Sequence, residues 1–190
     1  MTTLDLSQRL PALLAGRPRR SLASSPYRPS AVLVPFVAGA EGWSVLLTQR
    51  ATDLAHGGQI AFPGGAIDPQ DQDAVQAALR ETEEELGLSP TALQVWGLFD
   101  DFGPTSSGFY TTPVVAQAPA GYPFRPNPAE VSAIVTVPLA WLRCPANQYI
   151  EVRHRPPLPP LIYIWQYGPH KIWGLTSRIL KSLLDLLPTA

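Results

Sequence analysis

Short apolar runs bounded by turn residues dominate the chain and predict a protein rich in β-strands. Runs with the length and composition of strands lie at residues 31–39, 43–50, 93–100, 109–116 and 131–137, with two more within 149–166. Residues 40–42 (Ala-Glu-Gly) predict a hairpin turn between the first two strands. Because Pro35 has no N–H to donate, we expect it at a sheet edge or in a bulge.

An amphipathic helix is predicted within residues 64–88. Residues three and four positions apart share a face of a helix, and a stripe with this spacing runs through Val75, Leu79, Thr82 and Leu86. Glu81, Glu84 and Glu85 have the same spacing and share a second face, about 130° around the helix. We therefore expect one side of the helix to pack on the core and the other to gather three carboxylates.

Both ends of the chain also show helical spacing. A short amphipathic segment begins residues 1–30, and we expect it to pack on the domain or to meet a partner chain, for example in a homodimer. A wide apolar face near the other end predicts a helix that covers the sheet and carries Ile179, Leu180, Leu183, Leu184 and Leu187. We expect residues 1–30 to form an N-terminal extension and residues 31–190 to form one domain.

Composition narrows the classes of function. A chain of 190 residues fits one domain with a substantial core. Its net charge of −1 gives no electrostatic reason to expect binding to nucleic acid or to an anionic membrane. No apolar run approaches the roughly 20 residues that span a membrane, so a cytoplasmic protein is the expectation.

Cys144 is the only cysteine, which excludes an intramolecular disulfide and a zinc site built from several cysteines. We expect it to be a small buried residue rather than a nucleophile.

The three carboxylates of the predicted helix are the first candidates for chemistry. Close carboxylates repel one another unless a cation neutralises them, and clusters of oxygen ligands suit Mg²⁺ or Mn²⁺. The alternative is that the acidic face is only solvated, as most such faces are. The glycines that frame the helix, Gly64 and Gly65 before it and Gly87 after it, favour the first interpretation.

The stretch from Gly64 to Leu88 resembles the Nudix box, the signature of hydrolases that cleave a nucleoside diphosphate linked to another group. That pattern is Gly, five spacers, Glu, seven spacers and then Arg-Glu-apolar-x-Glu-Glu-x-Gly-apolar. The second half is matched by Arg80, Glu81, Glu84, Glu85, Gly87 and Leu88. Thr82 stands at a position that is usually apolar. The first half is one residue longer than the pattern. Counting forward from Gly65 therefore places the first Glu of the pattern at Asp71, whereas counting back from Arg80 places it at Gln72.

A second motif precedes the box. Leu-Leu-Thr-Gln-Arg, ending at Arg50, is followed by His-x-Gly-Gln-x-x-Phe-Pro-Gly-Gly, which begins at His56. This order resembles the coenzyme A pyrophosphatase branch of the Nudix superfamily, although Ala55 replaces a basic residue and the stretch after Arg50 is one residue shorter. The resemblance implies an α/β fold, a Nudix-type α/β/α sandwich with a mixed β-sheet and the catalytic helix packed on it.

The resemblance also implies roles for individual residues. Mg²⁺ or Mn²⁺ would be held by Glu81, Glu84, Glu85 and the backbone carbonyl of Gly64, and Arg80 would hold Glu84 or another carboxylate of the box. Glu130 follows the sheet and is a candidate metal ligand or base; the alternative is a side chain that anchors its own loop. Glu81 and Glu130 both remain candidates for the general base.

Substrate contacts are expected from Arg50, His56 and Gln59. Arg153 and Arg155, with the histidine between them, are candidates for holding a substrate phosphate, and the alternative is a charged hairpin tip in water. The implied reaction is hydrolysis of coenzyme A or a derivative, a small-molecule nucleotide substrate, to 3′,5′-ADP and 4′-phosphopantetheine. The alternatives are a pyrophosphatase for another substrate, such as ADP-ribose, and a Nudix-fold binding domain without catalysis.

Overall fold

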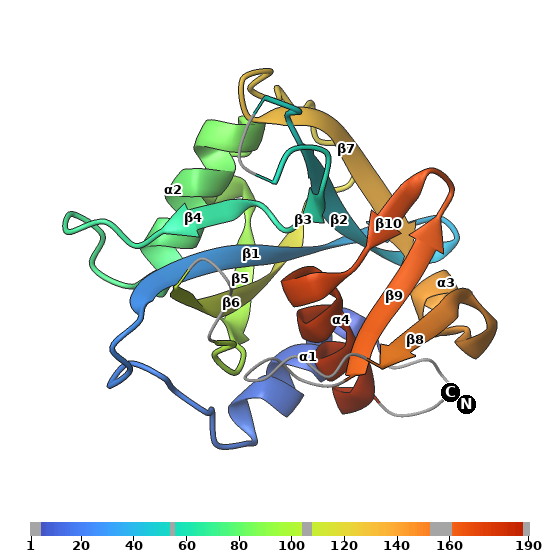
Figure 1. Ribbon diagram of the computed structural model, residues 1–190, viewed down its shortest axis with the longest axis horizontal. Coiled ribbons are helices and arrows are strands. Elements are labelled where there is room, and N and C mark those ends of the chain that lie inside the picture. The colour runs from blue at the N-terminus through green and yellow to red at the C-terminus, as the bar shows by residue number, and fades with distance from the viewer. Residues whose placement is uncertain (1–4, 54–55, 104–107, 153–160, 188–190) are drawn as a thin grey trace.

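The computed structural model describes residues 5–53, 56–103, 108–152 and 161–187 (Figure 1). The strands are β1 (Arg28–Gly39), β2 (Gly42–Arg50), β3 (Ile60–Ala61), β4 (Gly64–Ala66), β5 (Gln94–Leu98), β6 (Phe109–Ala118), β7 (Val131–Pro138), β8 (Gln148–Val152), β9 (Leu161–Tyr167) and β10 (His170–Ile172). The helices are α1 (Leu6–Ala15), α2 (Ala74–Leu86), α3 (Leu139–Arg143) and α4 (Gly174–Leu186), with 3₁₀ turns η1 (Pro90–Ala92) and η2 (Pro145–Asn147). None of these helices is long and apolar enough to cross a membrane.

Two sheets form the centre of the molecule. The larger has the order β3-β2-β1-β6-β5, with β4 paired to β1 and β7 paired to β2. It is a mixed sheet, because β1 runs parallel to β6 while its other neighbours are antiparallel. The smaller sheet has the order β10-β9-β8. The mixed sheet agrees with what the family resemblance implied. The two strands predicted within residues 149–166 correspond to β8 and β9 of the smaller sheet, whereas β10 was not among the predicted strands.

Alternate residues of β1 bury against opposite layers, as expected for a strand covered on both faces. Leu33 packs with Ala77 and Ala78 of α2 on one face. Val34, the next residue, belongs to the larger core on the other face, which holds apolar side chains of α1 and α4, among them Leu10, Leu14, Ile179, Leu180 and Leu183. The expected α/β/α sandwich, with the acidic helix packed on the sheet, is confirmed.

Pro35 lies inside a central strand, so its expected place at an edge or bulge is wrong. On the side away from β6, β1 pairs with β4 at residues 30–32 and with β2 at residues 36–39. Pro35 falls between these two stretches while it stays in register with Ala116 of β6. A proline is tolerated here because β1 changes partner where a ladder hydrogen bond would otherwise be lost.

The N-terminal helix packs against the sheet. Asp5 caps α1 by accepting a hydrogen bond from the Ser7 N–H, and the buried side chains Leu6, Leu10 and Leu14 belong to the larger core. The division of the chain at residue 30 stays a prediction.

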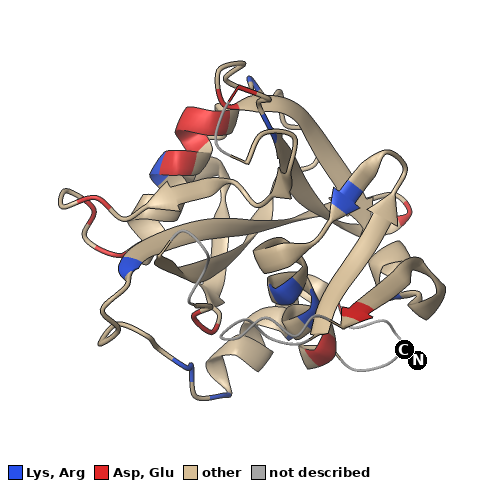
Figure 2. Ribbon diagram, viewed as in Figure 1, with Lys and Arg blue, Asp and Glu red and all other residues tan. Residues whose placement is uncertain are grey.

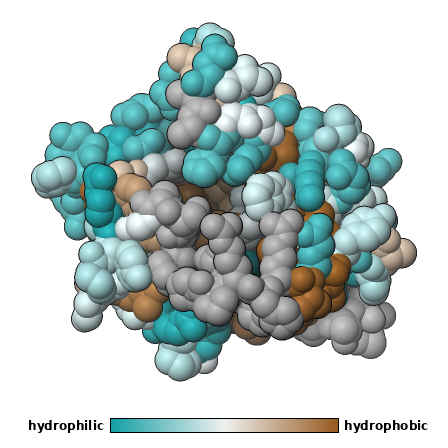
Figure 3. Space-filling view, in the orientation of Figure 1, coloured by the Kyte–Doolittle hydropathy of each residue, from teal (hydrophilic) through white to brown (hydrophobic). Residues whose placement is uncertain are grey.

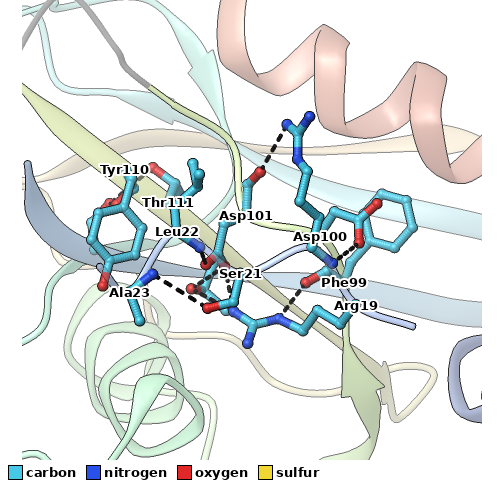
Figure 4. A network of polar contacts seen from close by, with 12 residues as sticks. Arg19, Ser21, Leu22, Ala23, Phe99, Asp100, Asp101, Tyr110 and Thr111 are labelled. Atoms are coloured by element: carbon cyan, nitrogen blue, oxygen red, sulfur yellow. Dashed lines mark hydrogen bonds and ion pairs between the residues drawn. The ribbon is translucent and has the colours of Figure 1, made fainter. Parts of the chain in front are cut away.

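The segment that follows α1 is held by acidic residues from far along the chain. Arg17 pairs with Asp100 at 2.9 Å, and Arg19 pairs with Asp101. Asp101 also accepts hydrogen bonds from the Leu22 N–H at 2.7 Å and from the Thr112 hydroxyl at 2.6 Å. Figure 4 shows Arg19, Leu22 and Asp101 converging in this network.

Apolar side chains are exposed on the smaller sheet. Brown atoms gather over β8 and β9 in Figure 3, where Ile150, Val152 and Leu161 are exposed.

Cys144 is exposed, so the expectation that it is buried is wrong. It ends α3 and leads into η2, and this turn lies at the surface rather than under a neighbouring element.

Candidate active site

Helix α2 carries the acidic residues, and its two ends are fixed by local chemistry. The Asp73 side chain caps the helix by accepting a hydrogen bond from the Gln76 N–H at 2.9 Å. At the other end Gly87 has φ 63°, a left-handed conformation that favours glycine. The Arg125 N–H donates to the carbonyl of Leu86, at 2.8 Å. The segment between β6 and β7 is thereby held against the end of the acidic helix.

The expected core stripe of α2 is only part of its buried face. Thr82 and Leu86 are buried as predicted, and the Thr82 hydroxyl donates to the Ala78 carbonyl at 2.7 Å, which lets it occupy an otherwise apolar position. Val75 and Leu79 are only partly buried, and Ala77 and Ala78 take the fully buried places.

The three glutamates of α2 lie in three different environments. Glu85 is buried with 5% of its surface exposed, Glu81 is half-buried, and the Glu84 side chain is 55% exposed. The three residues share one side of α2, as the spacing predicted, and the charge of Glu81 acts on Glu85. The spacing did not predict the burial of Glu85, which lies where this side meets the core. Figure 2 shows the acidic residues concentrated on α2.

Glu85 is a buried carboxylate whose hydrogen bonds are incomplete. Its Oε2 atom has no hydrogen-bond partner among the described residues. Burial raises the pKa of Glu85 to about 7, and the negative charges of Glu130 and Glu81 raise it further. A hydrogen bond from the Gly64 backbone and the positive charge of Arg50 oppose this rise. A buried carboxylate in this state is ready to accept a proton or a cation.

Glu81 lies directly over the glycine pair. A Cβ atom at Gly65 would lie 2.5 Å from the Glu81 carboxyl carbon, so only glycine leaves room for this carboxylate. Burial raises the pKa of Glu81, while the bond from Arg80 opposes the rise. The negative charges of Glu84 and Glu130 also act on this group. Glycine is therefore required here for close approach.

Arg80 holds several carboxylates at once. It donates to both oxygens of Asp71, at 3.1 and 3.0 Å, and to Glu81 at 2.9 Å. A longer contact of 3.3 Å reaches Glu84. The Asp71 side chain is 2% exposed, whereas Gln72 is exposed, so Asp71 is the residue of the lengthened half of the box that turns toward Arg80. Counting the spacing forward from Gly65 was the sequence signal for it.

Glu130 lies near the buried glutamates. Its carboxylate accepts a hydrogen bond from the Asn127 side chain at 3.1 Å, and the Asn127 N–H donates to the Glu85 carbonyl at 2.8 Å. Its charge raises the pKa of both Glu81 and Glu85. The structure thus brings Glu130, Glu81 and Glu85 together.

Of the substrate contacts predicted before the box, the structure links Arg50 to the acidic cluster, whereas His56 and Gln59 make backbone contacts within their own loop. Arg50 ends β2, where its N–H donates to the Gln59 carbonyl at 3.0 Å and its carbonyl accepts from the Gly58 N–H at 3.0 Å. The charge of Arg50 acts on Glu85. His56 has φ 63° and an exposed side chain, and its carbonyl accepts from the Gln59 N–H. Arg153 and Arg155 lie outside the described residues.

The carboxylate oxygens gathered at this site are ligands of the kind that divalent cations such as Mg²⁺ and Mn²⁺ prefer. The charges of Glu84 and Glu130 act on Glu81, and those of Glu130 and Glu81 act on Glu85. Arg80 and Arg50 oppose them, and the buried Oε2 atom of Glu85 has no partner among the described residues. Within the described ranges no three His, Cys, Asp or Glu side chains are already gathered around one point. The Arg80 guanidinium instead contacts both Glu81 and Glu84.

Comparison with known proteins identifies the family to which this chain is similar. A model of the NUDIX domain matches residues 26–160. An uncharacterized Nudix hydrolase NudL from Photorhabdus laumondii is 36% identical over 180 residues, which cover 94% of each chain. An uncharacterized Nudix hydrolase NudL from Yersinia pestis is 37% identical over 161 residues, covering 84% of this chain and 80% of that protein.

Solved structures share the fold. The Nudix hydrolase RenU from M. smegmatis superposes with a TM-score of 0.51 and 28% identity, over 58% of this chain and 70% of that one. DR0079 from Deinococcus radiodurans has a TM-score of 0.52 and 15% identity, over 86% of this chain and 89% of that one. Because the domain match spans more than half of the sequence and the bacterial relatives cover most of it, the chain belongs to the Nudix hydrolase family.

Proposed function

We propose that the protein hydrolyses the diphosphate linkage of coenzyme A or one of its derivatives, with Mg²⁺ or Mn²⁺ as cofactor. Water would cleave the linkage to give 3′,5′-ADP and 4′-phosphopantetheine. The observation that carries the proposal is the loop from His56 to Gly65, which resembles the coenzyme A pyrophosphatase branch. Its backbone is bonded to Arg50 at one end and to Glu85 at the other.

The metal would be held by the carboxylates of Glu81, Glu84 and Glu85 and by the backbone carbonyl of Gly64. A divalent cation bound there would neutralise the charge of the diphosphate and lower the pKa of bound water. The role of Arg80 is to position Glu81 and Glu84, because its bidentate contact with the buried Asp71 fixes the guanidinium between them. Because a residue held in this way moves little during the reaction, little free energy is spent on reorganising the site.

Arg50 supplies positive charge on the substrate side of the acidic cluster. It is the cation that acts on Glu85 from β2, and a guanidinium suits a phosphate oxygen pair. His56 and Gln59 follow in the same loop and are the proposed contacts to the rest of the substrate. The proton of the attacking water would pass to Glu81 or Glu130, the two candidates for the base.

A substrate panel tests the proposal. Coenzyme A, ADP-ribose, NADH and a diadenosine polyphosphate are incubated separately with the protein and Mg²⁺ or Mn²⁺, and the products are separated by chromatography. We expect coenzyme A to be hydrolysed fastest, with no turnover in excess EDTA. Faster turnover of ADP-ribose would contradict the substrate assignment. Binding of nucleotides without any turnover would instead support a non-catalytic domain.

A further inference from the structure

Arg178 of α4 is a half-buried arginine without an acidic partner. Its guanidinium lies over the Phe102 ring, 5.6 Å from the ring centroid. Within the described ranges it has neither an ion pair nor a hydrogen-bond acceptor. Burial lowers the pKa of Arg178, and the positive charge of Arg20 lowers it further. A charge removed from water in this way is costly unless an anion or a set of acceptors compensates it.

Arg20 brings a second guanidinium to the same place. Its Nη2 atom donates to the carbonyl of Asp101 at 3.4 Å, and Asp101 directly precedes Phe102, on which Arg178 lies. The acids of this region are already engaged, because Asp100 pairs with Arg17 and Asp101 pairs with Arg19. Two guanidinium groups therefore approach one another with no carboxylate between them in the described part of the chain.

This pair lies apart from the acidic cluster but within reach of one ligand. Ala66, Ser30, Thr111 and Phe102 are consecutive partners across the sheet. At about 4.8 Å per strand, Phe102 lies roughly 14 Å from Ala66, whose carbonyl accepts a bond from Arg80. In Figure 2 the basic part of α4 and the acidic part of α2 lie on either side of β1 and β4.

Helix α4 is also tied to the loop before the box. The Thr176 hydroxyl donates to the Ile60 carbonyl at 3.1 Å. Ile60 follows Gln59, and Arg178 lies two residues after Thr176. The position of Arg178 is thus fixed relative to the loop that carries the proposed substrate contacts.

We propose that Arg20 and Arg178 together bind a phosphate monoester of the substrate, away from the diphosphate that is cleaved. This inference rests on the proposed function, in which the matching group is the 3′-phosphate of coenzyme A. Two guanidinium groups present paired N–H donors that suit the oxygens of a dianionic phosphate. Bound phosphate would supply the missing counter-charge, so the site selects substrates that carry a third phosphate.

Kinetics with paired substrates test this role. Coenzyme A and 3′-dephospho-coenzyme A are compared for the wild type and for Arg178→Met, with Lys181→Met as the control because Lys181 lies on the same helix but pairs with Asp185. We expect Arg178→Met to lower kcat/KM for coenzyme A about 10- to 100-fold, mainly through KM. Turnover of the dephospho substrate should stay within about twofold, as should both substrates with Lys181→Met. An equal loss for both substrates, or no loss for either, would overturn the proposal.

A binding measurement keeps the site testable apart from catalysis. Calorimetric titration compares 3′,5′-ADP with 5′-AMP, which lacks the 3′-phosphate. We expect the wild type to bind 3′,5′-ADP at least about tenfold more tightly, and both Arg178→Met and Arg20→Gln to remove that preference. Equal affinity of the wild type for both nucleotides would refute the anion site, whereas failure to hydrolyse coenzyme A with the preference intact would refute only the proposed reaction. Thermal unfolding should show Arg178→Met to be at least as stable as the wild type.

Discussion

Asp101 and Glu85 are both buried carboxylates, with 1% and 5% of their surfaces exposed, yet their surroundings differ. Asp101 is fully engaged by the guanidinium of Arg19, the Leu22 N–H and the Thr112 hydroxyl. Glu85 has one oxygen with no partner and other carboxylates nearby, and burial raises its pKa to about 7. The same chemical group is thus held in two different environments in one fold.

The difference distinguishes a structural acid from a functional one. A carboxylate with satisfied oxygens and its own arginine stabilises a segment, in this case the stretch after α1. A carboxylate that is buried among other carboxylates is unfavourable in the folded protein until a proton or a cation arrives. We infer that Glu85 and its neighbours are held in this state for metal binding, and each of the following changes tests one side of the contrast.

The largest expected effect comes from Glu84→Gln. Turnover should fall about 10²- to 10³-fold, because this substitution removes a charged ligand at the reacting diphosphate. The melting temperature should hardly change, since the side chain is 55% exposed. Glu83→Gln is the matched control, an exposed neighbour on α2 with no assigned role. Unchanged turnover in Glu84→Gln would exclude this residue from the mechanism.

The next effect is on the pH dependence of stability, measured without metal. The folded-state pKa of Glu85 is raised from 4.5 to about 7. The stabilisation that comes from this raised pKa is therefore fully present below pH 4.5 and is lost as the pH rises through 7. The free energy of unfolding of the wild type, relative to Glu85→Gln, should fall by about 3 kcal/mol over this window. Urea titrations at several pH values measure it, and a parallel pH profile for the two proteins would contradict the assigned environment.

Asp101→Asn tests the structural side of the contrast. We expect it to destabilise the protein by about 2 kcal/mol, because it leaves Arg19 without its charge partner; Arg19 is 30% exposed, which moderates the loss. Asp100→Asn is the control, since Asp100 is itself 30% exposed and should cost less than about 1 kcal/mol. Equal losses in the two variants would show that burial of Asp101 contributes little.

The smallest change in stability is expected at Gly65. In Gly65→Ala the new methyl group would displace the flexible end of Glu81, so stability should change by less than about 1 kcal/mol while turnover falls about tenfold or more. Gly64→Ala should instead destabilise the protein by about 3 kcal/mol or more, because Gly64 has φ 147° and its Cβ would lie 2.3 Å from the Ala31 carbonyl oxygen, a backbone atom. Normal turnover in a folded Gly65→Ala variant would contradict the placement of Glu81.

The sequence predicted those features that depend on local spacing. The strands and the box helix follow from apolar runs and from helical periodicity, and the box motif names Glu81, Glu84 and Glu85. The environment of Glu85 could not be predicted in this way, because the hydrogen bond from Gly64 and the charge of Glu130 that act on it come from segments outside the helix. Whether Asp71 or Gln72 turns to Arg80 likewise depends on how the extra residue of the loop is accommodated.

Long-range pairs were the hardest to anticipate. Arg19 and Asp101 are 82 residues apart, and nothing in the local pattern of either residue indicates the other. Arg20 and Arg178 come near one another because the segment after α1 reaches Asp101 and α4 reaches the adjacent Phe102. Strand β10 was missed because three residues before a helix carry too short a pattern to be distinguished from the helix itself.

Mn²⁺ binding tests the contrast most directly. Calorimetric titrations of the wild type, Glu85→Gln and Glu83→Gln at pH 6 and pH 8, in buffers of different ionisation enthalpy, give both the affinity and the number of protons released. We predict that the wild type binds more tightly at pH 8 and releases protons at pH 6, because Glu85 must lose its proton. Glu83→Gln should behave like the wild type, while Glu85→Gln should bind at least about tenfold more weakly. Binding by Glu85→Gln as tight as that of the wild type, with the same proton release, would contradict the account.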